Sequence, residues 1–391
     1  MNFLRRRFAS TTTTSSLFAS DNVSGCDARI FVRIAQEYGH APSTSSSSSS
    51  VDQSATRSSY GGDATTRRVV SRLARTVAHN DADSVDVQLV YNGTAANVAA
   101  LACVLRPFDA VLAAQHAHLL TAECGALERF TGARIVPMVS RDAFTGLVDE
   151  HDVQRAVDVC GERDDVHSVR PRVLSITQVN EFGVAYSLSD VAALRRACDR
   201  HRLLLHIDGA RISNAAVHLG ASFADVLQHA DLASFGMTKN GALCGEALLL
   251  FRSRLLRRGI ALDDIEQAGR VRKQAMQLHS KSAFLAAQFD AFLDDDVWRA
   301  NAAHANGMAQ LLARLITQRA GAIGITRRVD ANAVFVRFPT PQVLAAVQQT
   351  YSSLGEWAPP NPEVRLMCSY ATTAAQVEAL VACFTRALAL K

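Results

Sequence analysis

The chain has 391 residues, of which 48% are hydrophobic and 20% charged, with 21 glycines and 9 prolines. This composition excludes a disordered protein or a coiled coil and suits one large domain or two to three smaller ones. The net charge of +4 comes mostly from Arg5, Arg6 and Arg7, so it gives no argument for binding nucleic acid or a membrane. No apolar run approaches the roughly 18 residues of a transmembrane helix. The eight cysteines include no C-x-x-C pair, which argues against disulfides or a metal site and favours reduced intracellular thiols.

The first sixty residues contain two stretches of low complexity. Residues 1–17 are rich in Arg, Ser and Thr and contain no acid, which is typical of a disordered tail or of a mitochondrial transit peptide. Residues 43–50 are almost entirely serine, with no apolar side chain to bury, and predict a solvated loop within an N-terminal arm over residues 18–59. We expect a cytoplasmic protein, with a mitochondrial location as the alternative.

Short apolar runs alternate with amphipathic segments through the middle of the chain. The pattern predicts helices at Thr66–Ala78, Thr94–Leu105, Leu119–Phe130 and Asp149–Val157. The predicted strands are Val85–Val90, Ala110–Ala113, Ile135–Met138, Arg172–Thr177, Leu203–Ile207, Leu232–Phe235 and Ala247–Phe251. Such alternation, with strands apolar on both faces, indicates an α/β fold with a mostly parallel sheet. Ligands of these sheets lie beyond the carboxyl ends of the strands.

The C-terminal third has a different pattern. A long helix or helix pair is expected at Ile265–Leu293, and a smaller α+β domain follows from about Asn301. Its predicted elements are the strands Val334–Phe338 and Val364–Cys368 and the helices Gln342–Leu354 and Ala374–Ala389. We therefore predict a large domain over residues 60–265, connecting helices over 266–300 and a small domain over 301–391.

An acid and a lysine follow two of the predicted strands, 31 residues apart. Asp208 ends a fully apolar strand, where an ionised carboxylate needs a cation, either Arg211 or a protonated ring nitrogen such as that of pyridoxal phosphate. Lys239 lies among small uncharged residues, where desolvation makes a lysine amine nucleophilic and suited to a Schiff base. The pair is more specific than either residue, since a lysine in a Gly-rich turn is often only a surface residue.

The segment Asn92-Gly93-Thr94 follows the first predicted strand and opens a helix. Backbone N–H groups at a helix start, together with a threonine hydroxyl, can hold an anion, although the same residues also suit a simple helix cap. The segment lacks the lysine of a nucleotide-binding P-loop, which argues against ATP or GTP.

Two histidines, His116 and His118, follow the strand Ala110–Ala113. An imidazole at this position can stack on an aromatic cofactor and act as an acid or base. The spacing alone does not choose between them.

Together these motifs resemble the threonine aldolase/β-eliminating lyase family of fold-type-I pyridoxal phosphate enzymes, and most of all the low-specificity L-threonine aldolases. The most specific block is His206-Ile-Asp-Gly-Ala-Arg-Ile-Ser-Asn-Ala with Ser234-Phe-Gly-Met-Thr-Lys-Asn-Gly. Segments of the form Gly-Thr-Ala-Ala-Asn, His-x-x-x-x-Glu and Tyr-Gly-Gly-Asp occur in the order that family requires. The resemblance implies an aspartate aminotransferase-like large domain with a smaller C-terminal α+β domain.

The resemblance also implies roles for individual residues. Lys239 would form the imine with pyridoxal 5′-phosphate, Asp208 would pair with its ring nitrogen, and Arg211 would lie near its phenolic oxygen. Gly93 and Thr94 would hold the phosphate. His118 would stack on the ring and is the candidate base, because it stands five residues before Glu123 as the family pattern requires.

Four further residues are implied by the same resemblance. Ser20 and Arg365 would grip the substrate carboxylate. Tyr60 would come from a neighbouring subunit of a homodimer or homotetramer, and Lys273 would approach the phosphate. The expected substrate is a β-hydroxy-α-amino acid such as L-threonine or allo-threonine, cleaved to glycine and an aldehyde by a carbon–carbon lyase.

Other readings of the same motifs stay open. Another pyridoxal phosphate reaction, such as β-elimination, phenylserine cleavage or transamination, uses the same fold, and a non-catalytic scaffold could retain it. Some threonine aldolases carry a second active-site histidine after the strand Arg172–Thr177, where this chain has Thr177-Gln-Val-Asn-Glu181. A proton relay through two histidines is therefore not expected.

Overall fold

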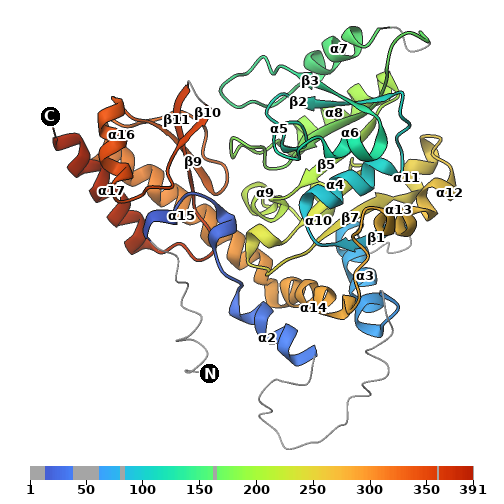
Figure 1. Cartoon of the computed structure of the whole chain (residues 1–391), viewed down its shortest axis with the longest axis horizontal. Coiled ribbons are helices and arrows are strands. Elements are labelled where there is room, and N and C mark those ends of the chain that lie inside the picture. Colours follow the sequence, from blue (N-terminus) through green and yellow to red (C-terminus); the bar gives the residue numbers. More distant parts are fainter. Residues whose placement is uncertain (1–13, 38–60, 80–83, 162–164, 359–360, 391) are drawn as a thin grey trace, which may run out of the picture.

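The computed structural model describes residues 14–37, 61–79, 84–161, 165–358 and 361–390. The predicted serine-rich loop over residues 43–50, the first 13 residues of the tail and Tyr60 lie outside these ranges. Figure 1 shows a larger part built around one sheet and a smaller part around a second sheet, with the helix α15 running between them.

The larger sheet has seven strands in the order β1-β7-β6-β5-β4-β2-β3. They are β1 Val85–Val90, β2 Asp109–Ala114, β3 Arg134–Met138, β4 Arg170–Thr177, β5 Leu204–Gly209, β6 Leu232–Gly236 and β7 Glu246–Phe251. Only β7 is antiparallel to its neighbours, so the α/β prediction with a mostly parallel sheet is confirmed. Every residue of β2, β5, β6 and β7 is buried, because helices cover both faces.

The helices around this sheet begin where the sequence provides caps. Asp63 caps α3 by accepting a hydrogen bond from the Thr66 N–H, and Ser187 forms a capping box at the start of α8. The helices of this part are α2 Ala28–Glu37, α3 Ala64–Val77, α4 Gly93–Ala102, α5 His118–Thr121, α6 Ala126–Thr131, α7 Glu150–Val159, α8 Leu188–His201, α9 Ile212–Leu219, α10 Phe223–Val226, α11 Arg252–Arg257, α12 Leu262–Glu266, α13 Ala268–Gln274 and α14 Ser282–Leu293. Short 3-10 turns lie at η1 Thr14–Ser16, η2 Asp21–Val23, η5 Thr238–Asn240 and η6 Asp294–Asp296.

The smaller sheet is antiparallel, in the order β10-β11-β9-β8. Its strands are β8 Gly324–Ile325, β9 Ala333–Arg337, β10 Glu356–Ala358 and β11 Asn361–Met367, and its helices are α15 Val297–Arg319, α16 Pro341–Gln348 and α17 Ala374–Ala389. Val336, Leu366 and Phe384 belong to a second hydrophobic core, separate from that of the large sheet. The short strands β8 and β10 were not predicted, because two or three residues carry no detectable alternation.

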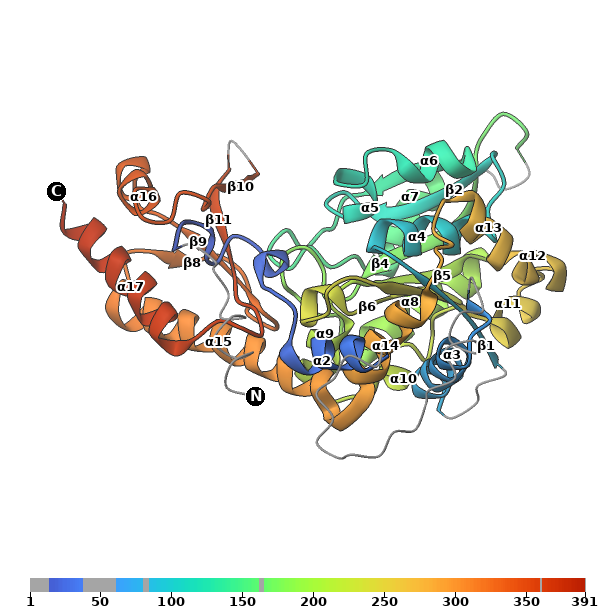
Figure 2. The same ribbon diagram turned by 60° about the horizontal axis from the view of Figure 1, so that its bottom comes forward.

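Two segments join the parts. Trp298, near the start of α15, packs in the core of the large part, whereas Leu312 and Ile316 of the same helix pack in that of the small part. The N-terminal segment contributes Phe18 to the second core, and the Phe18 carbonyl accepts a hydrogen bond from the Met367 N–H at 2.8 Å. Further along, α2 lies beside α14, as both views show (Figures 1 and 2).

Two predicted helices were wrong in extent, and one segment shows the second of its two predicted forms. The expected helix Leu119–Phe130 is two short helices, α5 and α6, because Cys124 and Gly125 take left-handed φ angles of 55° and 69°. The segment Ile265–Leu293, expected as a long helix or a helix pair, contains the pair α13 and α14, separated by a stretch in which Met276 and Lys281 take φ angles of 61° and 60°. The expected helix Gln342–Leu354 ends at Gln348, where α16 gives way to a turn. Hydrophobic periodicity did not reveal the break at Cys124, because a residue other than glycine rarely takes a positive φ.

None of the helices in the described ranges has the length and apolar character needed to span a bilayer.

Candidate active site

A cavity of about 480 Å³ opens at the carboxyl-terminal edge of the large sheet. It is lined by Ser20, Asn22, Tyr91, Asn92, Gly93, Thr94, Asn97, His118, Thr121, Ala122, Glu123, Thr177, Glu181, Asp208, Ala210, Arg211, Thr238, Lys239, Glu246, Trp357 and Arg365. The segments that follow β1, β2, β4, β5 and β6 meet here, together with residues of β10 and β11. The site was predicted at the carboxyl ends of the parallel strands, and the cavity lies there.

Lys239 lies in the turn η5 immediately after β6. Burial, followed by the positive charge of Arg211, lowers the pKa of Lys239 below its usual value. Among the described residues, no carboxylate lies within ion-pair distance of its ammonium group. A buried lysine with a lowered pKa is a competent nucleophile toward a carbonyl group.

Asp208 stands at the end of β5 and is buried. Its carboxylate accepts hydrogen bonds from the Asn97 side chain at 3.0 Å and from the Ala210 N–H at 3.0 Å. The same Asn97 amide also donates to Glu123 at 3.0 Å. No cationic side chain of the described residues lies within ion-pair distance of Asp208, so the alternative pairing with Arg211 is not seen. A buried carboxylate of this kind is suited to a cationic ligand atom.

The two candidate histidines occupy different environments. His118 lines the cavity, and its Nδ1 lies 3.0 Å from Glu123 Oε1. This hydrogen bond is the largest cause of a pKa of His118 above the usual histidine value. His116 is instead stacked on the Phe182 ring at 4.3 Å, and burial lowers its pKa to about 4. The tertiary structure thus places His118, but not His116, among the described residues that line the cavity.

Gly93 and Thr94 form the first turn of α4. The Asn92 side chain caps this helix by accepting a hydrogen bond from the Ala95 N–H at 2.9 Å. The N–H groups of Gly93 and Thr94 have no acceptor among the described residues, and a Cβ added to Gly93 would meet nothing within 4 Å. The open space and free N–H groups at a helix start suit an anion.

Arg211 is held by a residue that the sequence analysis did not single out. Its Nε and Nη2 donate to the two oxygens of Asp21, at 2.8 and 3.0 Å. Burial would raise the pKa of Asp21, but the charge and hydrogen bonds of Arg211 outweigh it and leave that pKa lowered. The only sequence signal was the neighbouring Ser20, which lines the cavity and accepts a hydrogen bond from the Asn22 N–H at 3.1 Å.

Arg365 reaches the cavity from β11 of the small part. Its guanidinium carbon lies 3.9 Å from the centre of the Trp357 ring, and its Nε is buried without a hydrogen-bond partner. Burial lowers the pKa of Arg365 to about 10. The arginine remains a cation, and no carboxylate of the described residues lies within ion-pair distance of it. Trp357 could not be singled out from the sequence, because nothing marks the short strand β10 on which it lies.

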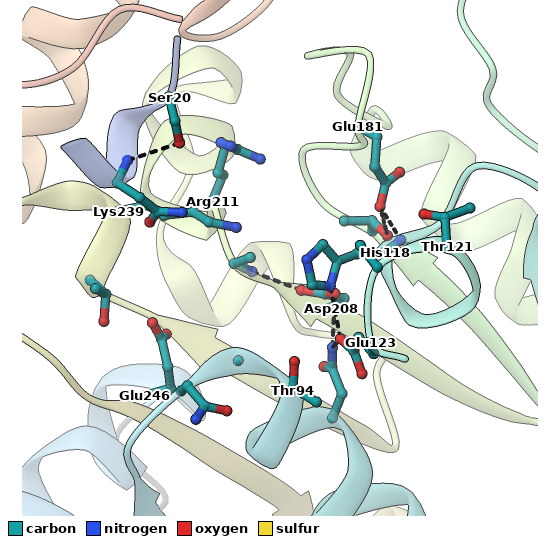
Figure 3. A pocket seen from close by; sticks show the side chains of 18 of the residues that line it. Ser20, Thr94, His118, Thr121, Glu123, Glu181, Asp208, Arg211, Lys239 and Glu246 are labelled. Carbon is teal, nitrogen blue, oxygen red and sulfur yellow. Dashed lines mark hydrogen bonds and ion pairs between the residues drawn. The ribbon is translucent and has the colours of Figure 1, made fainter. Parts of the chain in front are cut away.

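Two buried glutamates of the cavity were also missed as site residues. Glu181 accepts hydrogen bonds from the His118 N–H at 2.7 Å and from the Thr177 hydroxyl at 3.2 Å. Glu246 accepts one from the Met237 N–H at 3.1 Å. Burial raises the pKa of each carboxyl group to about 7. In Figure 3, Glu246 and Thr94 stand below Lys239, and Glu181 stands beside His118 on the opposite wall.

Of the predicted residues that the structure describes, Lys273 is not among those that line the cavity. Lys273 lies on α13, which packs against α4 outside the cavity. Tyr60 lies outside the described residues. The structure therefore brings together Ser20, Gly93, Thr94, His118, Asp208, Arg211, Lys239 and Arg365.

Comparison with known proteins identifies the family of the chain. The model of the family described as β-eliminating lyase matches residues 46–340. The chain is 34% identical to a low specificity L-threonine aldolase of Pseudomonas aeruginosa, over 93% of this chain and 95% of that protein. It is 33% identical to a low specificity L-threonine aldolase of a Pseudomonas species, over 95% and 97% of the two chains.

Solved structures show the same fold. The chain superposes on the threonine aldolase of Leishmania major with a TM-score of 0.79 and 24% identity, over 95% of this chain and 99% of that one. It superposes on an aspartate aminotransferase of Thermus thermophilus with a TM-score of 0.65 and 16% identity, over 98% of both chains. The predicted aspartate aminotransferase-like fold is confirmed. On its sequence and its fold, the chain belongs to the threonine aldolase/β-eliminating lyase family.

Proposed function

We propose that this protein is a pyridoxal 5′-phosphate-dependent carbon–carbon lyase that cleaves β-hydroxy-α-amino acids, such as L-threonine and L-allo-threonine, to glycine and an aldehyde. One observation carries the proposal. Lys239, Asp208 and Arg365 line a single cavity, and among the described residues each is without an ion-pair partner. Three unpaired charged groups in one cavity are unfavourable unless a ligand compensates them. The names of the two Pseudomonas relatives support the substrate class.

The residues of the cavity fit the cofactor. The amine of Lys239 would bond to its aldehyde carbon, and the Asp208 carboxylate would keep its ring nitrogen protonated. The free N–H groups of Gly93 and Thr94, with the Thr94 hydroxyl, would hold its phosphate. Arg211 and His118 would contact the ring. When bound, pyridoxal phosphate supplies a cationic ring that accepts the electron pair left on the substrate Cα.

The chain's own groups would orient the substrate. Arg365 can bind the α-carboxylate through two parallel N–H···O bonds, because Trp357 holds its guanidinium plane and leaves its Nε unpaired. Ser20 lies at the same cavity and can assist it. Rotation about the bond between the substrate nitrogen and Cα decides which bond at Cα is broken. A fixed carboxylate sets this rotation. The anchor would thereby select cleavage of Cα–Cβ.

A proton must leave the β-hydroxyl group as the aldehyde forms. The Nδ1 of His118 is engaged by Glu123, which leaves Nε2 to accept that proton directly or through a water. The charge of Glu123 stabilises the imidazolium that results. This step involves one histidine, as expected from the sequence Thr177-Gln-Val-Asn-Glu181 after β4.

The function is tested by incubating the purified protein and cofactor with L-threonine, L-allo-threonine and phenylserine, while aldehyde, glycine, ammonia and keto acid are measured separately. Aldehyde and glycine in equal amounts would support the aldolase. Ammonia and keto acid in equal amounts, without aldehyde, would indicate β-elimination, and keto acid without ammonia would indicate transamination. A protein that binds no cofactor and releases none of these products would be a scaffold, and the proposal would be wrong.

A further inference from the structure

Glu246 is a buried carboxyl group that lies between Lys239 and the first turn of α4, where an anion can bind. It is the first residue of β7 and pairs with Val90 on β1 and with Gly236 on β6. The chain runs on from Val90 to the start of α4, and from Gly236 to Lys239. The register of these three strands therefore places Glu246 between the two segments, and Figure 3 shows it on the cavity wall with Thr94. The residue is only 7% exposed.

The electrostatic surroundings of Glu246 leave it weakly compensated. Its Oε2 accepts a hydrogen bond from the Met237 N–H, and its side chain also interacts with Thr238. Burial raises the pKa of Glu246, whereas the hydrogen bond with Thr238 and then the charge of Lys239 lower it. The first turn of α4 contains no charged side chain, and the nearby Tyr91 has a pKa raised further above neutrality by burial. Burial is the stronger effect, and the net pKa of about 7 makes both protonation states accessible near neutral pH.

A phosphate dianion bound at the start of α4 would lie near the carboxyl group of Glu246. An ionised carboxylate in the same cavity wall repels it, and the low local dielectric strengthens the repulsion. A protonated carboxyl group instead offers an O–H donor to a phosphate oxygen.

We propose that Glu246 takes up one proton when the cofactor's phosphate binds at the start of α4, and then donates a hydrogen bond to that phosphate. This inference rests on the proposed function only in taking pyridoxal phosphate as the ligand. The proton comes from solvent, and the carboxylate becomes a carboxylic acid whose O–H points to the phosphate. The competing explanation is that Glu246 serves only to hold the Met237–Lys239 turn through its hydrogen bond to the Met237 N–H.

The sign of the pH dependence follows from linkage. Bound phosphate raises the pKa of Glu246 above its value of about 7 in the free protein. The gain in affinity is therefore complete below that pH and is lost as the pH rises towards the pKa of the complex. Between the two pKa values the affinity should fall by up to about tenfold for each pH unit. A phosphate monoester is already mostly dianionic above its second pKa of about 6, so its own titration does not produce this fall.

The test uses pyridoxine 5′-phosphate, which carries an alcohol in place of the aldehyde and cannot bond to Lys239. Its binding to the protein stripped of cofactor is measured by calorimetry between about pH 7 and 9, in buffers of different ionisation enthalpy, which report proton uptake directly. We expect Glu246→Gln to take up close to one proton fewer than the wild type near pH 8, and its affinity to change less with pH. Proton uptake by the ring nitrogen beside Asp208 is common to both proteins and cancels in the difference.

The matched control is Glu181→Gln. It removes a second buried carboxyl group of the same cavity, but one that contacts His118 and Thr177 instead of lying beside α4. This variant should still take up the proton. Difference infrared spectra of the wild type should show a new protonated carboxyl band when the ligand binds, which tests the inference even if Glu246→Gln does not fold.

The outcomes separate this inference from the proposed function. Equal proton uptake by the wild type and by Glu246→Gln, zero included, overturns the role of Glu246 and leaves the aldolase proposal intact. A wild-type protein that binds neither pyridoxine phosphate nor pyridoxal phosphate overturns both.

Discussion

Asp21 and Arg211 form a buried ion pair between residues 190 positions apart in the chain, with both carboxylate oxygens engaged. Asp21 also accepts a hydrogen bond from the Asn332 side chain, which belongs to the small part. This one carboxylate therefore links the N-terminal segment, the large sheet and the small sheet at the wall of the cavity.

We predict that Asp21→Asn destabilises the protein and weakens substrate binding. The change leaves the guanidinium of Arg211 buried without a counter-charge, and breaking a buried pair in this way costs about 3–5 kcal/mol. Chemical and thermal unfolding measure the effect. The control is Glu150→Gln, which removes an exposed ion pair with Arg200 and should leave the unfolding midpoint nearly unchanged. Equal midpoints for the two variants would show that Asp21 is not a structural link.

Lys239→Ala should abolish the visible absorbance of the bound cofactor together with nearly all turnover. The reason is that no other amine lines the cavity to replace it among the described residues. Absorbance spectra and aldehyde release are measured on the same sample. Lys273→Ala is the control and should keep the absorbance band, because Lys273 lies on α13 outside the cavity. Normal activity in Lys239→Ala would refute the proposed function.

Arg365→Ala should keep the cofactor spectrum but lose catalytic efficiency by roughly two to three orders of magnitude. A charge-assisted bidentate contact contributes about 2–5 kcal/mol to binding, and Arg365→Lys should recover only part of it, since an ammonium lacks the planar fork. A titration with glycine, followed by absorbance, isolates the binding step. Arg337→Ala, on the exposed side of β9, is the control. If glycine binds Arg365→Ala as it binds the wild type, the carboxylate anchor lies elsewhere.

The pH dependence of activity should follow the pair of His118 and Glu123. The hydrogen bond to Glu123 raises the pKa of His118, so the imidazole stays protonated to a higher pH and becomes a base only as the pH rises through that pKa. In Glu123→Gln the amide oxygen can still accept the hydrogen bond, but the negative charge is gone. The acid limb of the profile of kcat/KM against pH should therefore move to lower pH.

The control for this shift is Glu128→Gln, which changes an exposed glutamate on α6 and should leave the profile unmoved. An acid limb that stays in place in Glu123→Gln would assign it to another group, of which Glu181 is the first candidate.

We predict a homo-oligomer in which Tyr60 completes the site of a neighbouring subunit. Mass photometry should show a dimer or tetramer, and Tyr60→Phe and Lys239→Ala should each be poorly active alone. When the two variants are unfolded and refolded together, one intact site per mixed dimer should restore about a quarter of the wild-type activity, given random pairing of subunits. An active monomer, or a mixture no more active than its parts, would refute this arrangement.

The sequence by itself determined the fold class and the residues that follow particular strands. Runs such as Leu203–Ile207 and Ala247–Phe251 are apolar on both faces, and that pattern has few solutions other than a strand in a covered sheet. Asp208 and Lys239 follow two such strands, so their proximity was implied by the edge at which parallel strands end. The motifs that indicated the family are short sequence segments, and the comparisons confirmed the family.

Only the tertiary structure decided which of several nearby polar groups face the cavity. His116 and His118 are two residues apart, and the turn after β2 directs one against Phe182 and the other toward Glu123. The residues missed from sequence, Asp21 and Glu246, are acids whose importance comes from partners on distant segments or neighbouring strands. Periodicity records where a residue lies along its own helix or strand. It carries no information on which distant side chain will be packed against that residue, because such contacts depend on how separate elements are brought together in the fold.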